Sequence, residues 1–167
     1  KEIFKEIDDA GSGLILTHTK NKGKGSALKT GLTYIQKYIS ENYIVVTLDV
    51  DGQHRPKDVE IVYKAAQKHP GYLILGSRKI QKETPLKSRL ATQITRMVYA
   101  LTTGIRIYDT KTGLRAFDNT ILPELLAIPG KRYEYEMNVL LVCSRKKIPM
   151  KEIGIETIYI NDNAGSH

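Results

Sequence analysis

The sequence predicts an α/β fold with a mostly parallel central sheet flanked by helices. Short apolar runs rich in β-branched residues alternate with segments whose apolar residues recur at helical spacing. Such a series is most simply arranged as a parallel sheet with right-handed connections, which binds ligands at the carboxyl ends of its strands. The 167 residues, 41% of them hydrophobic, suffice for one core, so we expect a single domain over residues 1–167.

The first half of the chain alternates regularly between strands and helices. The run LILTHT predicts a strand over residues 14–19, and apolar spacing predicts a helix over 25–40. A β-branched run predicts a buried strand over 42–50, and a helix over 55–69 follows with a proline near its first turn. A third buried strand is expected over 72–78.

The second half of the chain is less regular. A polar loop over 79–86 leads into a predicted helix over 88–104. The segment GLRAF predicts a strand over 113–117, a helix is expected over 135–146, and a final strand over 151–160.

The charge balance points to an anionic partner. The chain has 26 Lys and Arg against 18 Asp and Glu, a formal charge of +8 that suits nucleic acid, a lipid surface or phosphorylated ligands. The tyrosines are not interleaved with basic residues as a stacking platform, which disfavours a nucleic-acid-binding module. The single cysteine, Cys143, excludes an intramolecular disulfide, and we expect it to be packed inside the protein.

Two aspartates follow the second predicted strand, in the segment VVTLDVDGQH. Asp49 and Asp51 are two residues apart, so both side chains point to the same side if the strand continues. Oxygen ligands at this spacing suit Mg²⁺ or Mn²⁺, and Gln53 could add an amide oxygen. A plain turn explains an Asp-X-Asp-Gly run equally well, because Asp and Gly favour turns.

A glycine-containing segment, NKGKGSALKTG, occupies residues 21–31 at a strand-to-helix junction. Free backbone N–H groups at such a junction favour an anion such as phosphate. The spacing matches neither the Walker pattern nor the dinucleotide fingerprint, and a tight turn is the alternative. The carboxylate pair lies one strand away, so the two segments together suggest a metal–diphosphate site in which this segment binds the diphosphate.

Five segments together resemble a known family. They are NKGKGSALKTG, TLDVDGQHRPKDV, LILGSR, KSRLATQITRMVYALTTGIRIYDTKTGLRAF and YEYEMNVL. In order and rough spacing they are similar to the inverting family-two glycosyltransferases. More narrowly, they resemble the branch of dolichyl-phosphate mannose synthase and the bacterial polyprenyl-phosphate glycosyltransferases. The resemblance covers nearly the whole chain and implies a Rossmann-like nucleotide-diphospho-sugar transferase fold, known as GT-A.

The resemblance also implies roles for particular residues. It assigns metal ligation to Asp49, Asp51 and Gln53, and catalytic roles to Asp51, Arg89 and Asp109. The residues implied to bind the donor are Asn21, Gly23, Lys24, Gly25, Asp49, Gln53 and Arg78. Arg78 and Arg89 would bind a donor or acceptor phosphate, because a guanidinium matches phosphate oxygens. The implied cofactor is Mg²⁺ or Mn²⁺, and the implied donor is a nucleotide-diphosphate sugar, with uridine as the expected base.

The acceptor expected from the resemblance is a polyprenyl phosphate. Members that act on hydroxyl groups commonly carry a Glu-Asp pair, which this sequence lacks, and a phosphate acceptor needs no strong base. Asp109 could orient Arg115 or the sugar, or it could cap a turn. Glu136 could act in the site or start a helix, where an acidic residue suits the dipole. The corresponding location is cytoplasmic at the inner face of the membrane, with peripheral membrane association.

Family members usually begin with a strand and an acidic loop that grips the nucleotide base. The resemblance predicts that this sequence starts after that segment. A sugar nucleotidyltransferase remains an alternative within the same fold, because it could also use an aspartate pair and a basic glycine loop. An inactive scaffold is disfavoured by the intact acidic motif.

Overall fold

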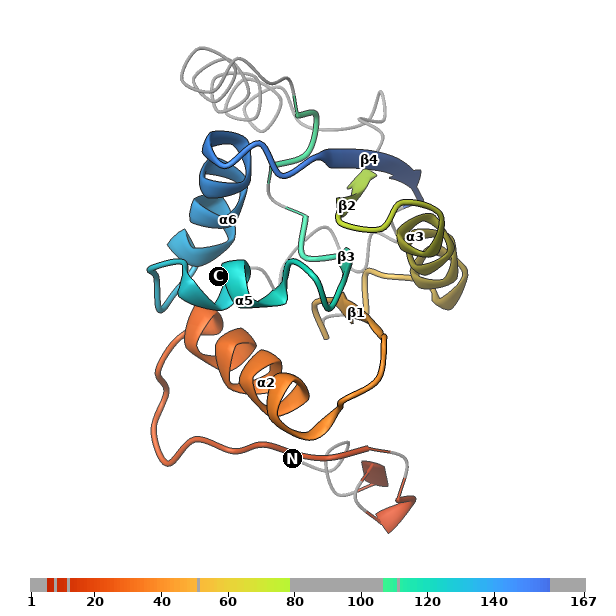
Figure 1. The fold of residues 1–167 in the computed structure, drawn as a ribbon. Helices are drawn as coiled ribbons and strands as arrows, with labels where there is room; N and C mark the ends of the chain where they lie inside the picture. Colours follow the sequence, from red (N-terminus) through yellow and green to blue (C-terminus); the bar gives the residue numbers. More distant parts are fainter. Residues whose placement is uncertain are drawn as a thin grey trace, which may run out of the picture.

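A computed structural model describes residues 6–7, 9–11, 13–50, 52–78, 107–110 and 112–156 (Figure 1). Its main elements are α2 (Lys24–Tyr38), β1 (Ile44–Thr47), α3 (Pro56–Lys68), β2 (Leu73–Arg78), β3 (Arg115–Asp118), α5 (Leu122–Ala127), α6 (Glu134–Arg145) and β4 (Met150–Ile155). The four strands form one sheet in the order β1-β3-β2-β4.

The sheet is mixed, with one strand reversed. β3 runs antiparallel to both of its neighbours, β1 and β2, whereas β2 and β4 are parallel. β1, β2 and β4 therefore run in the same direction, which agrees with the predicted mostly parallel sheet. Because the reversed strand lies in the middle, the segment before β3 reaches the edge where β1 and β2 end.

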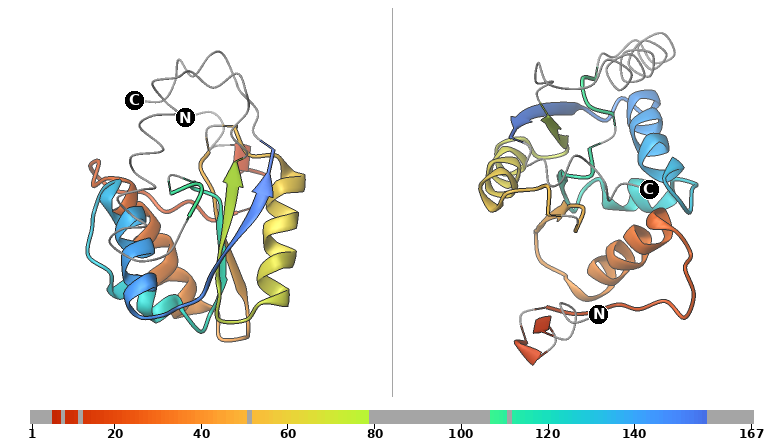
Figure 2. Two further views of the ribbon diagram at one scale, coloured as in Figure 1. Left: turned by 90° about the horizontal axis from the view of Figure 1, so that it is seen from above. Right: turned by 180° about the vertical axis from the view of Figure 1, so that it is seen from behind.

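Helices cover both faces of the sheet, with α3 on one face and α2, α5 and α6 on the other (Figure 2). Successive side chains of a strand point to opposite faces of the sheet, so neighbouring residues pack into different hydrophobic cores. Leu73 and Leu75 pack toward α2, α5 and α6, whereas Ile74 packs toward α3. In β3, Phe117 likewise packs toward α2, α5 and α6, and Ala116 packs toward α3. This alternation explains why strands with almost continuous apolar sequence are buried on both sides.

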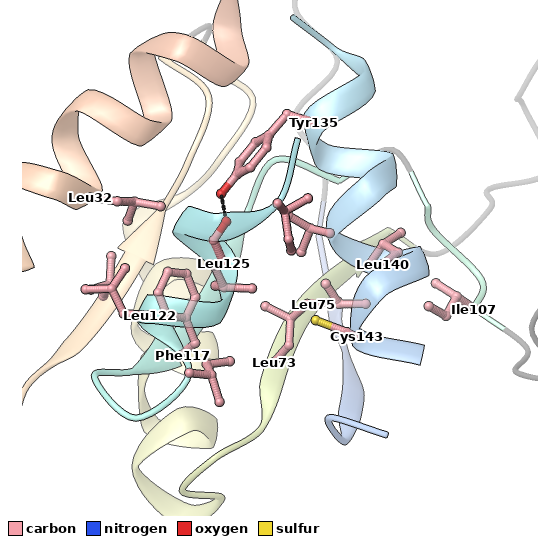
Figure 3. Close-up of a cluster of buried hydrophobic side chains, with 14 residues drawn as sticks. Leu32, Leu73, Leu75, Ile107, Phe117, Leu122, Leu125, Tyr135, Leu140 and Cys143 are labelled. Atoms are coloured by element: carbon pink, nitrogen blue, oxygen red, sulfur yellow. Dashed lines mark hydrogen bonds between the residues drawn. The ribbon is translucent and has the colours of Figure 1, made fainter. Parts of the chain in front are cut away.

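The larger core lies beneath α5 and α6 (Figure 3). Tyr135 is buried in it, and its hydroxyl donates a hydrogen bond to the Leu125 carbonyl at 3.0 Å. Cys143 is fully buried in the same core, which confirms its predicted packing role. Burial raises the pKa of the Cys143 thiol to about 11, so the side chain stays protonated near neutral pH.

The strand predicted over residues 14–19 does not form. The segment belongs to none of the ladders of the sheet, and Leu14 and Leu16 are 60% and 43% exposed. A strand requires a hydrogen-bonded neighbour, and here His18 Nε2 contacts Thr30 Oγ1 of α2 instead, at 2.9 Å. Helix α5 was not predicted from the sequence, because its six residues are too few to show a helical period.

Most of the predicted elements form in the structure, and two of them fall on residues that the structure does not describe. Helices α2, α3 and α6 and strands β1 to β4 form at the predicted places, with ends that differ by a few residues. The predicted loop over 79–86 and helix over 88–104 lie outside the described residues. Among the described residues, no helix is both long enough and apolar enough to span a membrane.

Candidate active site

Three strand ends and two helix starts surround the candidate site. Asp49 follows β1, Arg78 ends β2, and Thr47 of β1 pairs with Arg115 at the start of the reversed β3. The turn before β3 therefore lies at the same edge as the two strand ends. Ligands of open α/β sheets bind at this edge.

The glycine segment forms the entry to α2. The Asn21 side-chain oxygen accepts a hydrogen bond from Gly23 N at 2.9 Å, and Gly23 adopts a φ of 92°, a conformation that favours glycine. Gly25 is buried, and a Cβ there would lie 2.8 Å from the Arg132 carbonyl oxygen. The glycines therefore let the start of α2 pack closely against the turn before α6. This arrangement agrees with the tight turn that was the alternative to a phosphate site for this segment. It places Lys24 at the first position of α2.

Lys24 joins two carboxylates from different elements. Its ammonium lies 2.6 Å from Asp49 Oδ1 and 2.8 Å from Glu136 Oε2. Burial lowers the pKa of Lys24, but the hydrogen bonds to Asp49 and Glu136 outweigh this effect and leave the pKa above its ordinary value. The cluster is thus a half-buried cation held between two anions. It brings together the predicted donor residues Lys24 and Asp49.

Glu136 reaches the candidate site, where the sequence allowed either a functional role or the start of a helix. It lies in the first turn of α6, but its carboxylate points to Lys24. Glu134, two residues earlier, instead accepts hydrogen bonds from the backbone N–H groups of Lys131 and Arg132 at 2.9 and 3.1 Å. Residues two apart on a helix point in different directions, so one glutamate shapes the turn and the other reaches the site.

Arg78 and Asp109 form a second charged pair. Arg78 Nε and Nη2 donate to the two Asp109 carboxylate oxygens at 2.7 and 3.2 Å. Asp109 is buried, and its backbone N–H donates to Glu152 Oε1 at 2.9 Å. Asp109 therefore holds Arg78, the predicted phosphate-binding arginine. Among the described residues, the side chains of Asp109 and Arg115 share no hydrogen bond, but the Asp109 charge opposes the lowering of the Arg115 pKa by burial.

Arg115 is a buried cation beneath the site. Its Nε donates to the Thr112 carbonyl at 3.1 Å and its Nη1 to the Glu136 carbonyl at 2.9 Å. Nη2 has no hydrogen-bond partner among the described residues. Arg115, Glu136 and Thr47 line a small pocket with apolar neighbours from α2, α5, α6 and the sheet. Arg115 thus connects the turn before β3 to the helix that carries Glu136.

The donor set for a divalent ion is only partly described. Asp49 offers carboxylate oxygens of the kind that Mg²⁺ and Mn²⁺ prefer, and its carboxylate fills the space left by the missing side chain of Gly113. Gln53 is half-buried in the turn after Gly52, whose φ is 79°. Asp51 and Arg89 lie outside the described residues. Within the described part of the chain, no three His, Cys, Asp or Glu side chains gather as a metal site.

Comparisons with known proteins identify a family and several relatives of the chain. Residues 1–124 match the model of the family described as Glycosyl transferase family 2. The chain is 32% identical over 151 residues to UDP-N-acetylglucosamine–dolichyl-phosphate N-acetylglucosaminyltransferase of Methanococcus voltae, covering 87% of this chain and 59% of that protein. An uncharacterized protein of Methanocaldococcus jannaschii is 31% identical over 151 residues, covering 87% of this chain and 61% of that protein.

A more distant relative comes from a bacterium. The undecaprenyl-phosphate 4-deoxy-4-formamido-L-arabinose transferase of Pseudomonas aeruginosa (strain LESB58) is 28% identical over 109 residues, which cover 65% of this chain and 30% of that protein. The chain spans about three fifths of the length of the two archaeal relatives, at 61% and 59%.

Proposed function

Because the chain belongs to glycosyl transferase family 2, with its GT-A fold, we propose that it is the catalytic part of an inverting glycosyltransferase. The proposed donor is a nucleotide-diphosphate hexose, with uridine as the expected base, and the proposed acceptor is a polyprenyl phosphate. The observation that carries the proposal is the charged cluster of Lys24, Asp49 and Glu136 at the ligand-binding edge of the sheet.

The chemistry requires stabilisation of negative charge on the leaving diphosphate. In this proposal Asp49, Asp51 and Gln53 would hold Mg²⁺ or Mn²⁺, which supplies positive charge at the diphosphate when bound. Arg78 would present its guanidinium to a phosphate, and Asp109 fixes the orientation of that guanidinium. Preorganised groups of this kind contribute on the order of 3 kcal/mol each in other enzymes.

The proposed acceptor follows from the names of the relatives and from acid–base chemistry. The Methanococcus voltae relative is named for dolichyl phosphate and the Pseudomonas relative for undecaprenyl phosphate. A phosphate monoester is already anionic near neutral pH, since its second pKa is about 6. It can therefore attack the sugar without a strong base in the protein.

The donor site is tested by calorimetric titration of uridine and guanosine diphosphates into the full-length protein, with and without Mn²⁺. We expect metal-dependent binding of one nucleotide, and we expect Asp51→Ala and Asp49→Ala to lose it. Glu60→Ala on α3 is the matched control, because Glu60 is an exposed carboxylate that, among the described residues, pairs with Lys64 alone. Binding that is unchanged in both aspartate variants would refute the donor site.

A sugar nucleotidyltransferase is the competing function. The two activities differ in their products, because a glycosyltransferase forms a sugar–lipid and releases a nucleoside diphosphate. Incubation of the full-length protein with labelled nucleotide sugar and polyprenyl phosphate separates them. Label that enters the organic phase supports the proposal. Label that enters no lipid, together with nucleotide-sugar synthesis from a sugar phosphate and a nucleoside triphosphate, would refute it.

A further inference from the structure

The Lys24 ammonium occupies the space between the two carboxylates of the candidate site. An ammonium has three N–H donors, and here two are directed to Asp49 and Glu136 at 2.6 and 2.8 Å. The side chains of Lys24, Asp49 and Glu136 are 25%, 32% and 13% exposed, so solvent screens their interaction only partly. The Asp49 charge is therefore already compensated by a cation that belongs to the protein.

This arrangement conflicts with simple metal binding at Asp49. A divalent ion that approaches the carboxylate meets a like charge a few ångströms away, and it must either displace Lys24 or bind against its repulsion. The Asp49 side chain cannot retreat toward the turn before β3. The backbone of Gly113 lies so close there that a Cβ would be 2.6 Å from the Asp49 carboxyl carbon.

We propose that Lys24 is a resident counter-ion of the metal site, which opposes divalent-ion binding at Asp49 until the diphosphate of the donor accepts its ammonium. The inference rests on the proposed metal-dependent function. It makes stable metal binding depend on the nucleotide, so that the ion and the donor enter together.

The position of Lys24 suits such a transfer. Lys24 is the first residue of α2, at the end of the helix whose dipole favours an anion, and the Ser26 N–H of the same turn already donates to the Lys131 carbonyl at 2.8 Å. A diphosphate bound at that helix start would lie within reach of the third ammonium donor. Phosphate oxygens accept hydrogen bonds from ammonium groups, and the charge pairing strengthens these bonds.

Glu136 would not be left as an isolated anion when Lys24 moves. Arg115 lies behind it and donates from Nη1 to the Glu136 carbonyl at 2.9 Å. Burial lowers the pKa of Arg115, and the nearby Glu136 charge opposes that shift. In this proposal the buried Arg115, whose guanidinium contacts the Glu136 backbone, remains as a fixed cation near Glu136 after Lys24 has turned to the diphosphate.

The test is Mn²⁺ binding, measured by calorimetry or electron paramagnetic resonance on the full-length protein with and without saturating uridine or guanosine diphosphate. Without nucleotide, we expect Lys24→Met to bind Mn²⁺ about tenfold more tightly than the wild type, because the repelling charge is gone. With nucleotide, the advantage of the variant should shrink or reverse, because the lysine then contributes to diphosphate binding. Lys24→Gln, which keeps a polar end, should behave like Lys24→Met.

Lys22→Met is the matched control, since it removes the same charge from an exposed position two residues away. It should bind Mn²⁺ like the wild type, and circular dichroism melting confirms that each variant is folded. If both Lys24 variants bind Mn²⁺ no more tightly than the wild type without nucleotide, the counter-ion role is wrong while metal-dependent nucleotide binding can still stand. If no protein binds Mn²⁺ even with either nucleotide, the proposed metal site fails, and this inference with it.

Discussion

At residue 113, the absence of a side chain leaves the space that the Asp49 carboxylate occupies. A Cβ there would lie 2.6 Å from the carboxyl carbon and 2.8 Å from Oδ1, so Gly113→Ala must displace Asp49. The Asp49 side chain is short and partly exposed, and it can turn away without disturbing the core. We therefore expect little change in folding, but a loss of roughly tenfold in Mn²⁺-dependent nucleotide affinity, measured by calorimetry.

Gly31→Ala is the control for this substitution. Gly31 lies inside α2, and a Cβ there meets nothing within 4 Å. Alanine is favoured over glycine in a helix interior by up to about 1 kcal/mol, so this variant should be slightly more stable and bind nucleotide normally. Equal nucleotide affinity in the two variants would show that the contact between Gly113 and Asp49 does not matter for the site.

At the scale of the elements, Arg115 connects β3 to α6. Its guanidinium satisfies the carbonyls of Thr112 and Glu136, which lose their hydrogen bonds if it is removed. Within the part of the chain that the structure describes, Nη2 of this guanidinium has no partner, so removal of the side chain also relieves a cost of burial. Because two acceptors are lost and one unpaired donor is relieved, we expect Arg115→Met to lower the free energy of unfolding by about 2 kcal/mol, measured by urea denaturation.

Arg55→Met provides the comparison for a surface arginine. Arg55 precedes α3 and pairs with Glu156, and the two side chains are 45% and 75% exposed. Exposed pairs of this kind contribute about 0 to 1 kcal/mol, so this variant should stay close to the wild type. If Arg115→Met were as stable as the wild type or more stable, desolvation of the buried charge would outweigh its two hydrogen bonds.

The elements that the sequence predicts well are those with a strong local pattern. Residues 25–40 and 55–69 carry clear helical spacing, and α2 and α3 form there. Residues 14–19 have an equally clear apolar run, but the pattern cannot say whether a neighbouring strand is available, and none pairs with it. The reversed direction of β3 is also absent from the pattern, because a buried strand reads the same in either orientation.

For the molecule as a whole, contacts between distant segments of the chain determine which site residues lie together. The resemblance placed Lys24 and Asp49 in one site, and the structure joins them. The pairing of Arg78 with Asp109 depends on contacts between segments 31 residues apart, and the approach of Glu136 to Lys24 depends on the packing of α2 against α6. Sequence motifs identify candidate residues, whereas the tertiary fold determines which of them are in contact.

The net charge of the chain makes a prediction about the surface on which a lipid acceptor would be found. A formal charge of +8 should draw the protein to anionic membranes, since a basic residue near such a surface contributes about 1 kcal/mol. We expect the full-length protein, purified without detergent, to sediment with vesicles that contain phosphatidylglycerol but not with phosphatidylcholine vesicles. About 0.5 M NaCl should release it, because added salt shortens the range of electrostatic attraction. Binding that is equal on both vesicle types, or that persists in high salt, would mean that apolar contacts rather than the basic charge hold the protein at the membrane.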